Sequence, residues 1–547
     1  MSQPYYRYFL LFAIFAYFVP SSVGISIQLS LKKYSDKTEI GQAIYHEETL
    51  DPEVENSIAL TDIPELLSFA ILQVHGHERN LSISYNDSTK CNGTRCTLYG
   101  ANLGLVAFFG QNSTASFVVI NREDKPISAL FSVVAYDRNA PMPGGCNMEF
   151  DFEVSPFQKL QFTDATVTLE AQPASAPRGI GPLCESPSVK LRRYRMFLPE
   201  REFKQETYFS GIQKMTTVQS ILENGEEILP ALDASSVRRV FSAYPGTGSI
   251  YAMIATYGNH SSAYVPAVSY ACSPLSSPSS CGNLNTKTAQ ALCAIVLIVG
   301  LIVAFIGHKC LGFEVVFLGA ISGGIISFAV LTAIGYFQTS TILGIVMGVS
   351  FLSGIGWLVL SCWMGMPCLA TFLSSLTLGF FVASTVYFGL ADDTSLFESD
   401  LNFWLIYVGI TLLVPIVLGL LPFVSNVVCC AILGSYTIIL PIDYYAGSNL
   451  KYIVINTIRR ATVPEFNAAV IRPPYQSTDK TLVAFIIIIA LVGIYVQVSK
   501  SICCFCSGKN STTVHWNERE PIISSPRRGR RVLVFRENDR VEHHRSW

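Results

Sequence analysis

Six cysteines ahead of the first long apolar run are the residues whose chemistry follows most directly from their placement. An even number of cysteines in an extracytoplasmic segment is typical of an oxidising compartment and of complete pairing. Many connectivities are open by counting alone. Proximity along the chain favours the pairs Cys91–Cys96, Cys146–Cys184 and Cys272–Cys281.

The same half of the chain holds five Asn-x-Ser/Thr sequons, which are acceptors for N-glycosylation in a secreted segment. Four of them fall close together, so we expect one face of this segment to carry glycans. A sixth sequon, at Asn510, lies in the predicted cytoplasmic tail and is expected to stay unmodified. The five predicted acceptors are Asn80, Asn86, Asn92, Asn112 and Asn259.

Signatures of catalysis are missing from the sequence. It contains no Gly-x-Ser-x-Gly elbow, no phosphate-binding Gly-x-x-x-x-Gly-Lys-Ser/Thr loop and no His-Glu-x-x-His pair. His75 and His77 would share one face of a strand, but no further metal ligand is suggested nearby, and we interpret them as ordinary surface histidines. We therefore expect a non-enzymatic protein with no cofactor, no metal and no nucleic-acid partner.

Two features of the C-terminal tail predict regulation. Cys503, Cys504 and Cys506 directly follow the last apolar run, within reach of palmitoylation at the membrane surface; reduced free thiols are the alternative. Further on, Glu518 stands four positions before Ile522 and Ile523, the arrangement of an acidic dileucine sorting signal. The tail would present this aliphatic pair to a sorting adaptor, which predicts cycling between the plasma membrane and endosomes. The alternative is a solvated piece of tail.

Composition shows which elements must position these residues. Half of the chain is hydrophobic and only 14% is charged, compared with roughly a quarter in an average soluble protein. The charge deficit lies in residues 289–498, where runs of about 18–25 apolar residues are long enough for membrane-spanning helices. We predict seven spans in a membrane domain covering residues 289–498: 289–306, 313–337, 341–363, 366–390, 401–421, 424–445 and 481–498.

Residues 1–24 are typical of a signal peptide, because Arg7 precedes a short apolar run that ends in small residues; an uncleaved first span is the alternative. With residues 25–287 extracytoplasmic, seven spans put the basic tail, residues 499–547, in the cytoplasm. The loop at residues 446–480 is expected outside, yet it carries five basic residues, which usually stay inside. The predicted extracytoplasmic position of this loop is therefore the part of the topology that disagrees with the distribution of basic residues. A segment of it, residues 452–460, has the character of an amphipathic helix at the membrane surface.

The segment before the membrane is predicted to be all-β. Short runs rich in Val, Ile, Phe and Tyr alternate with turn residues, as in residues 68–74, 104–109 and 129–136. This pattern is typical of β-sandwiches. Taking the Pro-rich stretch at 171–177 as a linker, we expect one sandwich in residues 25–170 and another in 178–287. The fold class is therefore a multi-domain membrane protein with an all-β ectodomain and an all-α seven-helix bundle.

Ionisable and polar groups in the spans are few: Glu314, Asn426 and Asp443 are the candidates for an ion pathway. Each lies close to a predicted span end, so we interpret them as groups that reach the interface. Small residues four apart, such as Gly319 with Gly323 and Ser375 with Gly379, predict closely packed helices.

Several segments resemble the transmembrane 7 superfamily member 3 family. They are Pro143-Gly-Gly-Cys-Asn-Met-Glu-Phe-Asp151, Pro245-Gly-Thr-Gly-Ser-Ile-Tyr251, residues 262–272, and Leu433-Gly-Ser-Tyr436 with Asp443 just beyond. The resemblance covers nearly the whole chain. It implies a cleaved signal, a glycosylated ectodomain, seven spans and a cytosolic tail, and an association with cell survival under stress, including protein-folding stress. It implies no catalytic residue.

From the resemblance we expect a regulator of cell survival and protein homeostasis, anchored in the lipid bilayer, whose ectodomain meets a protein partner or ligand. A signalling receptor is one alternative, although the third span lacks Asp-Arg-Tyr and the seventh lacks Asn-Pro-x-x-Tyr. A transporter or channel is the other; a hydrated cavity at Glu314, Asn426 or Asp443 would favour it.

Overall fold

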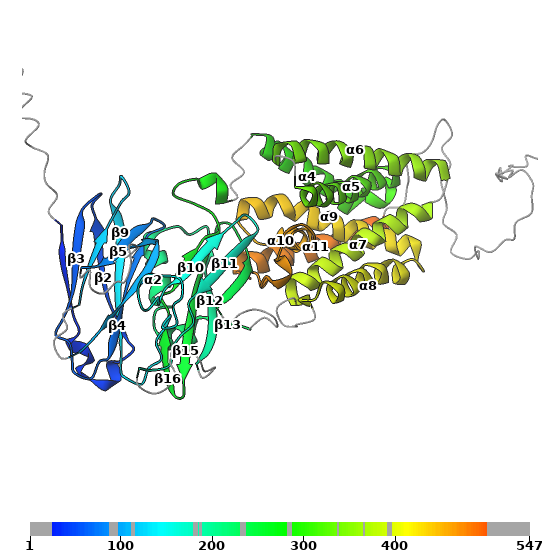
Figure 1. Ribbon diagram of the computed structural model, residues 1–547. Coiled ribbons are helices and arrows are strands. Elements are labelled where there is room, and N and C mark those ends of the chain that lie inside the picture. Colours follow the sequence, from blue (N-terminus) through cyan, green and yellow to red (C-terminus); the bar gives the residue numbers. More distant parts are fainter. Residues whose placement is uncertain are drawn as a thin grey trace, which may run out of the picture.

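The computed structural model describes residues 24–86, 97–110, 115–178, 184, 189–229, 237–281, 287–335, 339–364, 367–390 and 397–499 of the 547-residue chain. Two β-rich modules lie at one end and a bundle of long helices at the other (Figure 1). The predicted fold class, an all-β ectodomain followed by a seven-helix bundle, is confirmed.

The first module is a sandwich of two sheets that enclose one apolar core. One sheet has five strands in the order β1-β3-β8-β5-β6, and the other has four in the order β2-β9-β4-β7. All neighbouring strands are antiparallel except β1 and β3. The strands are β1 (Ser26–Ser30), β2 (Ala43–Leu50), β3 (Glu55–Thr61), β4 (Phe69–Gly76), β5 (Leu81–Tyr85), β6 (Thr97–Gly100), β7 (Asn102–Phe108), β8 (Ala115–Ile120) and β9 (Ile127–Tyr136).

The second module also has two sheets, and it lies between the first module and the helices (Figure 1). One sheet has the order β10-β11-β14; the other has the order β13-β12-β15-β16, with β17 also paired to β15. Two short helices, α2 (Gln205–Gln213) and α3 (Val218–Asn224), follow β12. The strands are β10 (Gln158–Phe162), β11 (Thr166–Ala171), β12 (Lys190–Glu200), β13 (Glu226–Ile228), β14 (Arg238–Ser242), β15 (Thr247–Tyr257), β16 (His260–Ala263) and β17 (Ala267–Ser269).

The boundary between the modules differs from the one expected at residues 171–177. Strands β10 and β11, which precede that stretch, pair with β14 of the second module. The Pro-rich stretch is therefore not a linker: Ser175 exchanges main-chain hydrogen bonds with Met142, and most of the stretch is buried. Prolines that interrupt a strand pattern mark an irregular connection, and such a connection lies inside a module as readily as between two.

The two modules pack tightly against each other through the four-stranded sheet. Every residue of β4 is buried, whereas β3 in the outer sheet alternates between buried and partly exposed positions. Leu130 of β9 belongs to a core cluster of the second module, and Val265 of the second module belongs to the core of the first. A sheet that is covered on both faces reads as a continuous apolar run, which explains the uninterrupted Phe69-Ala-Ile-Leu sequence.

Seven helices within the described ranges are long and apolar enough to cross a membrane, as predicted. A further helix, α10 (Tyr452–Thr462), lies at the end of the bundle that faces the ectodomain (Figure 1). The spanning helices are α4 (Lys287–Ile306), α5 (Leu311–Ile334), α6 (Thr339–Met364), α7 (Pro367–Leu390), α8 (Asp400–Leu418), α9 (Pro422–Ala446) and α11 (Ser477–Ser499).

Helix α9 is the most buried span, packed against α4, α7 and α11, whereas α6 packs chiefly on α5. Small residues make the close approaches: a Cβ on Gly434 would lie 2.4 Å from the Ala304 nitrogen of α4, and one on Gly379 would lie 2.2 Å from the Thr411 carbonyl of α8. Gly344 and Gly348, in contrast, face open space. The small-residue pattern therefore predicts only some of the helix contacts.

Candidate functional site at the ectodomain–membrane junction

The loop between α10 and α11 pairs with a strand of the ectodomain. The Val470 amide donates to the Val240 carbonyl of β14 at 2.9 Å, and the Ser242 amide donates to the Val470 carbonyl at 2.9 Å. A short piece of the membrane domain thus extends the β10-β11-β14 sheet at its β14 edge. Main-chain pairing of this kind satisfies backbone groups of both parts across the junction.

Tyr244, just after β14, is the aromatic anchor of the junction. It is only 2% exposed and belongs to an apolar cluster whose other buried members come from the membrane domain. Its hydroxyl donates to the Ile471 carbonyl and accepts from Asn456 Nδ2 at 3.3 Å. Its ring meets that of Tyr452 edge-on, with centroids 4.9 Å apart. A buried tyrosine whose ring packs and whose hydroxyl is hydrogen-bonded fixes both the position and the orientation of the ectodomain relative to the bundle.

The basic residues of the loop at 446–480 are bound within the protein. The Arg459 guanidinium donates to the carbonyls of Ala243 at 2.8 Å and Asp164 at 2.6 Å, both in the ectodomain. Arg472 pairs with Glu226 of β13. Arg460 pairs with the Asp400 carboxylate of α8 at 2.6 Å. The loop at 446–480, whose basic residues argued against an extracytoplasmic position, is thus in direct contact with the ectodomain.

A buried polar network lies where β12 ends against the membrane domain. Asp479, 1% exposed at the start of α11, accepts from Ser448 Oγ at 2.7 Å and from the amides of Asn449 at 2.8 Å and Gln476 at 2.9 Å. Asn449 Nδ2 in turn donates to Glu200 of β12 at 2.8 Å. A carboxylate that accepts several hydrogen bonds is well stabilised despite its burial.

Asp443, at the end of α9, completes the network. It is fully buried, pairs with Lys451 Nζ at 3.2 Å and accepts from the Leu450 amide at 3.0 Å. Burial lowers the pKa of Lys451. Three carboxyl groups and one ammonium group therefore meet at the junction, and the proton count of this set depends on how closely the ectodomain is docked.

Within this polar network, Glu200 is the group with the largest shift of pKa. Burial, and after it the charge of Asp479, raise the pKa of Glu200 from 4.5 to about 8. The docked state therefore binds a proton between these two values that an undocked Glu200 would release.

Docking is accordingly expected to weaken as pH rises from about 4.5 to about 8, because over that window the docked state holds the extra proton. The slope is at most about 1.4 kcal/mol per pH unit. Glu200→Gln, which keeps a hydrogen-bonding side chain without the titration, should flatten the dependence. Thermal unfolding of the purified protein across this window, for both forms, measures the effect; equal slopes would contradict the assignment.

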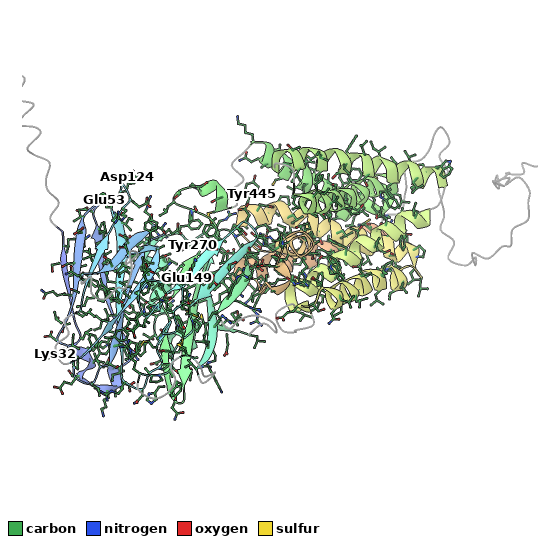
Figure 2. The ribbon with its side chains drawn as sticks, viewed as in Figure 1. Lys32, Glu53, Asp124, Glu149, Tyr270 and Tyr445 are labelled. Atoms are coloured by element: carbon green, nitrogen blue, oxygen red, sulfur yellow. A yellow bond between two sulfur atoms is a disulfide. The ribbon has the colours of Figure 1, made fainter. Side chains whose placement is uncertain are left out.

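A cavity of about 440 Å³ opens beside this network, between the ectodomain and the end of the bundle. Figure 2 shows Tyr445 at the end of the bundle nearest the ectodomain. Residues of both parts contribute to the cavity wall: Asp164, Arg201, Pro245, Gly246, Ser280, Cys281, Tyr444, Gly447, Lys451, Tyr452, Ile455 and Arg459.

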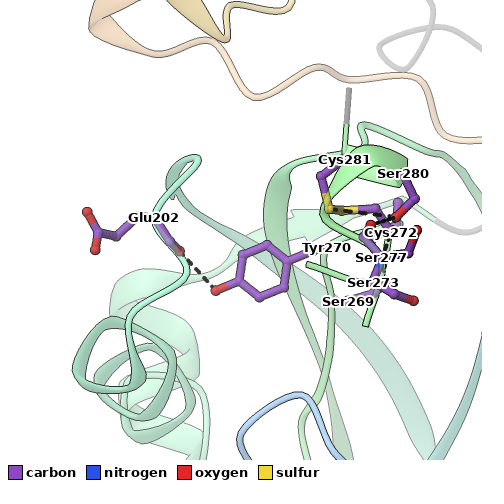
Figure 3. Close-up of a disulfide and its surroundings, with 9 residues drawn as sticks. Glu202, Ser269, Tyr270, Cys272, Ser273, Ser277, Ser280 and Cys281 are labelled. Atoms are coloured by element: carbon purple, nitrogen blue, oxygen red, sulfur yellow. Dashed lines mark hydrogen bonds between the residues drawn. A yellow bond between two sulfur atoms is a disulfide. The ribbon is translucent and has the colours of Figure 1, made fainter. Parts of the chain in front are cut away.

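Cys281, which lines the cavity, forms a disulfide with Cys272 (Figure 3). The short segment that it closes is tied further by Ser280 Oγ, which donates to the Ser277 carbonyl at 2.6 Å. Next to it, Tyr270 donates to the Glu202 carbonyl at 3.1 Å. The disulfide thus anchors the last segment of the ectodomain before α4 begins.

Glu314 and Asn426 do not reach the lipid interface, contrary to the sequence interpretation. They are 1% and 6% exposed and face each other inside the bundle. Ser374 Oγ donates to Glu314 Oε1 at 2.5 Å, and the orientation of the Asn426 amide that satisfies both groups puts its nitrogen 2.9 Å from both carboxylate oxygens. Asp443 is likewise buried. Neither Glu314 nor Asn426 lines the junction cavity.

The interpretation of His75 as a surface residue is also wrong. His75 is fully buried, with its ring nitrogens 2.9 Å from Asn102 Oδ1 and 3.2 Å from Gln73 Oε1. Burial lowers its pKa to about 4. His77 is partly buried and hydrogen bonds to the Phe203 carbonyl at 3.1 Å. Both faces of β4 are covered, so alternation in the strand did not bring His75 to solvent, and His77, just after β4, stays partly exposed. Among the described residues no group of three or more His, Cys, Asp or Glu could hold a metal ion.

The predicted modification sites are partly visible. Cys146 is bonded to Cys184, in addition to the Cys272–Cys281 pair. Asn80, Asn86 and Asn259 are all exposed. The remaining sites lie outside the described residues: Cys91, Cys96, Asn92, Asn112, the tail thiols Cys503, Cys504 and Cys506, and the sorting residues Glu518, Ile522 and Ile523.

Sequence reasoning did not find Tyr244, Glu200 or Asp479. Glu200 and Asp479 are far apart in the chain, and each is an ordinary residue beside a strand or helix end. The one available signal was the amphipathic character of residues 452–460, which marked α10 as a surface-lying element next to the junction.

The fold and this junction define a class: a multi-pass membrane protein with two immunoglobulin-like modules docked on a seven-helix bundle. Three family models match the chain in turn. They are "TM7SF3-like, N-terminal immunoglobulin-like domain" over residues 36–136, "TM7SF3-like, second immunoglobulin-like domain" over 141–275, and "TM7S3/TM198-like domain" over 293–498.

Curated relatives match over most of their length. Transmembrane 7 superfamily member 3 of Rattus norvegicus is 30% identical over 459 residues, covering 81% of this chain and 80% of the relative. The Mus musculus protein is 30% identical with coverage of 81% and 80%, and the Homo sapiens protein 28% identical with 81% and 79%. The chain belongs to the transmembrane 7 superfamily member 3 family, which is not a known enzyme family.

One solved structure, the Spr0440 glycoside hydrolase domain of Endo-D from Streptococcus pneumoniae R6, aligns with 42% of this chain and 33% of its own. The sequence identity is 8% and the TM-score 0.12, so this likeness carries no argument about fold or activity.

Proposed function

We propose that this protein is a non-enzymatic membrane regulator that supports cell survival under stress, including protein-folding stress, through interactions of its ectodomain. The observation that carries the proposal is the junction: main-chain pairing, the Tyr244 anchor and the buried polar network join the ectodomain to the bundle. A ligand or partner that shifts the ectodomain must then strain contacts of α9, α10 and α11. That gives the bundle a means to respond to extracytoplasmic events.

The proposed orientation puts the ectodomain outside and the C-terminal tail in the cytoplasm. An odd number of spans supports it. The contact of the loop at 446–480 with the ectodomain supports it further, because both must lie on the same side of the membrane. Most of the basic side chains of that loop form ion pairs or hydrogen bonds within the protein. They are therefore weaker evidence for a cytoplasmic loop under the positive-inside rule.

The proposal includes the modifications and traffic expected from the sequence. The exposed sequons Asn80, Asn86 and Asn259 would carry glycans on the ectodomain. Palmitoylation of Cys503, Cys504 and Cys506 would hold the start of the tail at the membrane. An adaptor that reads Glu518 with Ile522 and Ile523 would cycle the protein between the plasma membrane and endosomes.

Rescue of knockout cells tests the proposal. Cells that lack the protein and are exposed to a glycosylation inhibitor should survive better when wild-type protein is restored. Tyr244→Ala, compared at equal membrane abundance, should lose most of the rescue, because it uncouples the ectodomain. Tyr99→Ala, which removes a tyrosine that is 58% exposed on β6, should rescue fully. Survival that is independent of all three forms would refute the proposed role, and a second-messenger response lost with Tyr244→Ala would favour the receptor alternative.

A transporter remains the second candidate because Glu314 is buried inside the bundle with Asn426 and Ser374. An ionisable group in that position is costly and often functional. Ion or proton flux in proteoliposomes that contain the purified protein would distinguish this candidate.

A further inference from the structure

The junction cavity collects positive charge from both parts of the molecule. Arg201 follows β12 of the ectodomain, whereas Lys451 and Arg459 come from the α10 region of the membrane domain, and all three line the same cavity. Among the described residues that line the cavity, Asp164 is the one carboxylate. The cavity wall therefore holds three cationic groups against one anionic group.

Most of the hydrogen bonds of these three cations go to neutral oxygen atoms, which do not compensate the positive charge. Arg201 donates to the carbonyls of Tyr445, at 2.7 Å, and Tyr444. Arg459 donates to carbonyl and amide oxygens and to the Ser242 hydroxyl. Within the described part of the chain, neither arginine forms an ion pair; of the three cations only Lys451 does, with Asp443. Carbonyl oxygens orient a guanidinium but do not neutralise it.

Behind the wall, Asp443 pairs with Lys451, and Glu200, a second acidic residue of the polar network, contributes little negative charge at neutral pH. The pKa of Glu200 is raised to about 8 by its burial and by Asp479, so this carboxyl is mostly protonated at pH 7. With Lys451 compensated by Asp443, Arg201 and Arg459 supply the excess positive charge of the described lining, against the carboxylate of Asp164.

Another part of the lining is aromatic and aliphatic and comes from the membrane domain. Tyr444 belongs to the last turn of α9, and Tyr452 and Ile455 belong to α10. A cavity that combines cations with these rings, at the level where the spans end, matches an amphiphile with an anionic head and an apolar tail.

The geometry points to a binding site for the anionic phosphate headgroup of a lipid in the leaflet on the ectodomain side. Arg201 and Arg459, one from each part, would bind the phosphate oxygens together. A bound headgroup would then bridge the ectodomain and the bundle, and lipid composition would strengthen or weaken the junction.

Native mass spectrometry of the full-length protein in detergent tests this site, with anionic phosphatidylglycerol as the probe and phosphatidylcholine, which is zwitterionic with no net charge, as the comparison. Arg201→Gln should weaken phosphatidylglycerol binding about fivefold, the effect of one basic group near a membrane surface. Asp164→Asn should strengthen it by a similar factor. Asp164 is exposed, and only its main-chain carbonyl bonds Arg459, so this variant is expected to fold normally. The matched control Arg238→Gln removes a charge that pairs with Glu465 outside the cavity and should change nothing.

Glycerol 3-phosphate, added alone, separates a lipid site from a site for free phosphate. Weak binding of this soluble probe, with strong binding of the lipid, agrees with the inference. Equal binding of both with the same response to Arg201→Gln would overturn the lipid assignment. Indifference of phosphatidylglycerol binding to both Asp164→Asn and Arg201→Gln would overturn the site itself.

Discussion

Replacing Tyr244 by alanine is expected to separate the unfolding of the ectodomain from that of the helix bundle. Tyr244 is 2% exposed, packs against Tyr452 and shares its hydroxyl with Ile471 and Asn456. Truncating a buried aromatic side chain costs about 3–5 kcal/mol, or more than a hundredfold in the docking equilibrium. Thermal unfolding of the protein in detergent should change from one shared transition to two. All five tryptophans lie in the bundle or the tail. Tryptophan fluorescence therefore follows the bundle, and circular dichroism follows the strands of the ectodomain as well.

Limited proteolysis provides an independent readout for this variant. The ectodomain should be released from the bundle at protease concentrations that leave the wild-type protein intact. Tyr99→Ala serves as the control, because it removes a tyrosine that is exposed on β6. A single transition in Tyr244→Ala, at the wild-type temperature, would mean that the main-chain pairing at Val470 holds the junction without the aromatic anchor.

Replacing Asp479 by alanine should destabilise the same junction by a different route. The substitution leaves three donors without their acceptor in a buried site: Ser448 Oγ and the amides of Asn449 and Gln476. At about 1–3 kcal/mol for each buried unsatisfied donor, the total loss is on the order of 5 kcal/mol. Asp479→Asn keeps one acceptor oxygen and should lie between the alanine variant and wild type. Thermal unfolding of the purified variants measures all three.

The same variants also change the pH dependence. The charge of Asp479 is the second largest cause of the raised pKa of Glu200. Asp479→Asn should therefore lower the pKa of Glu200 and shift the upper end of the pH window downward. Asp124→Ala, at an exposed position of the first module, should alter neither the stability nor the window. Wild-type unfolding of Asp479→Ala would show that the network contributes nothing to docking.

Much of the architecture could be predicted from the sequence, because it depends on signals that are local in the chain. Each membrane span is a run of apolar residues that must satisfy its own backbone hydrogen bonds, so length and hydropathy suffice to recognise it. The β-rich nature of the ectodomain follows likewise from short runs such as β4 between turn residues. Sequence proximity also favoured the Cys146–Cys184 and Cys272–Cys281 pairs that the structure contains.

The boundary between the two modules could not be predicted, because it depends on strand pairing between segments that are distant in the sequence. Strand β11 lies ahead of the Pro-rich stretch, and its partner β14 lies far beyond it in sequence. Strand pairing is a long-range choice, whereas composition reports only on the neighbourhood of each residue. His75 was misjudged because the alternation in β4 says which residues share a face but not whether another module covers that face.

The charges of the loop at 446–480 show most clearly what only the tertiary structure decided. In the sequence alone, the positive-inside rule predicts a cytoplasmic loop, because the loop contains Lys451, Arg459, Arg460 and Arg472. In the folded protein Arg472 meets Glu226 of the ectodomain, and Arg460 meets Asp400 of another helix, each distant in sequence. The sequence by itself determined which segments enter the bilayer and which form sheets. Which charges meet across the junction depended on packing, because a charge is stabilised by whatever lies within a few ångströms of it, and that neighbourhood forms only when the ectodomain docks on the bundle.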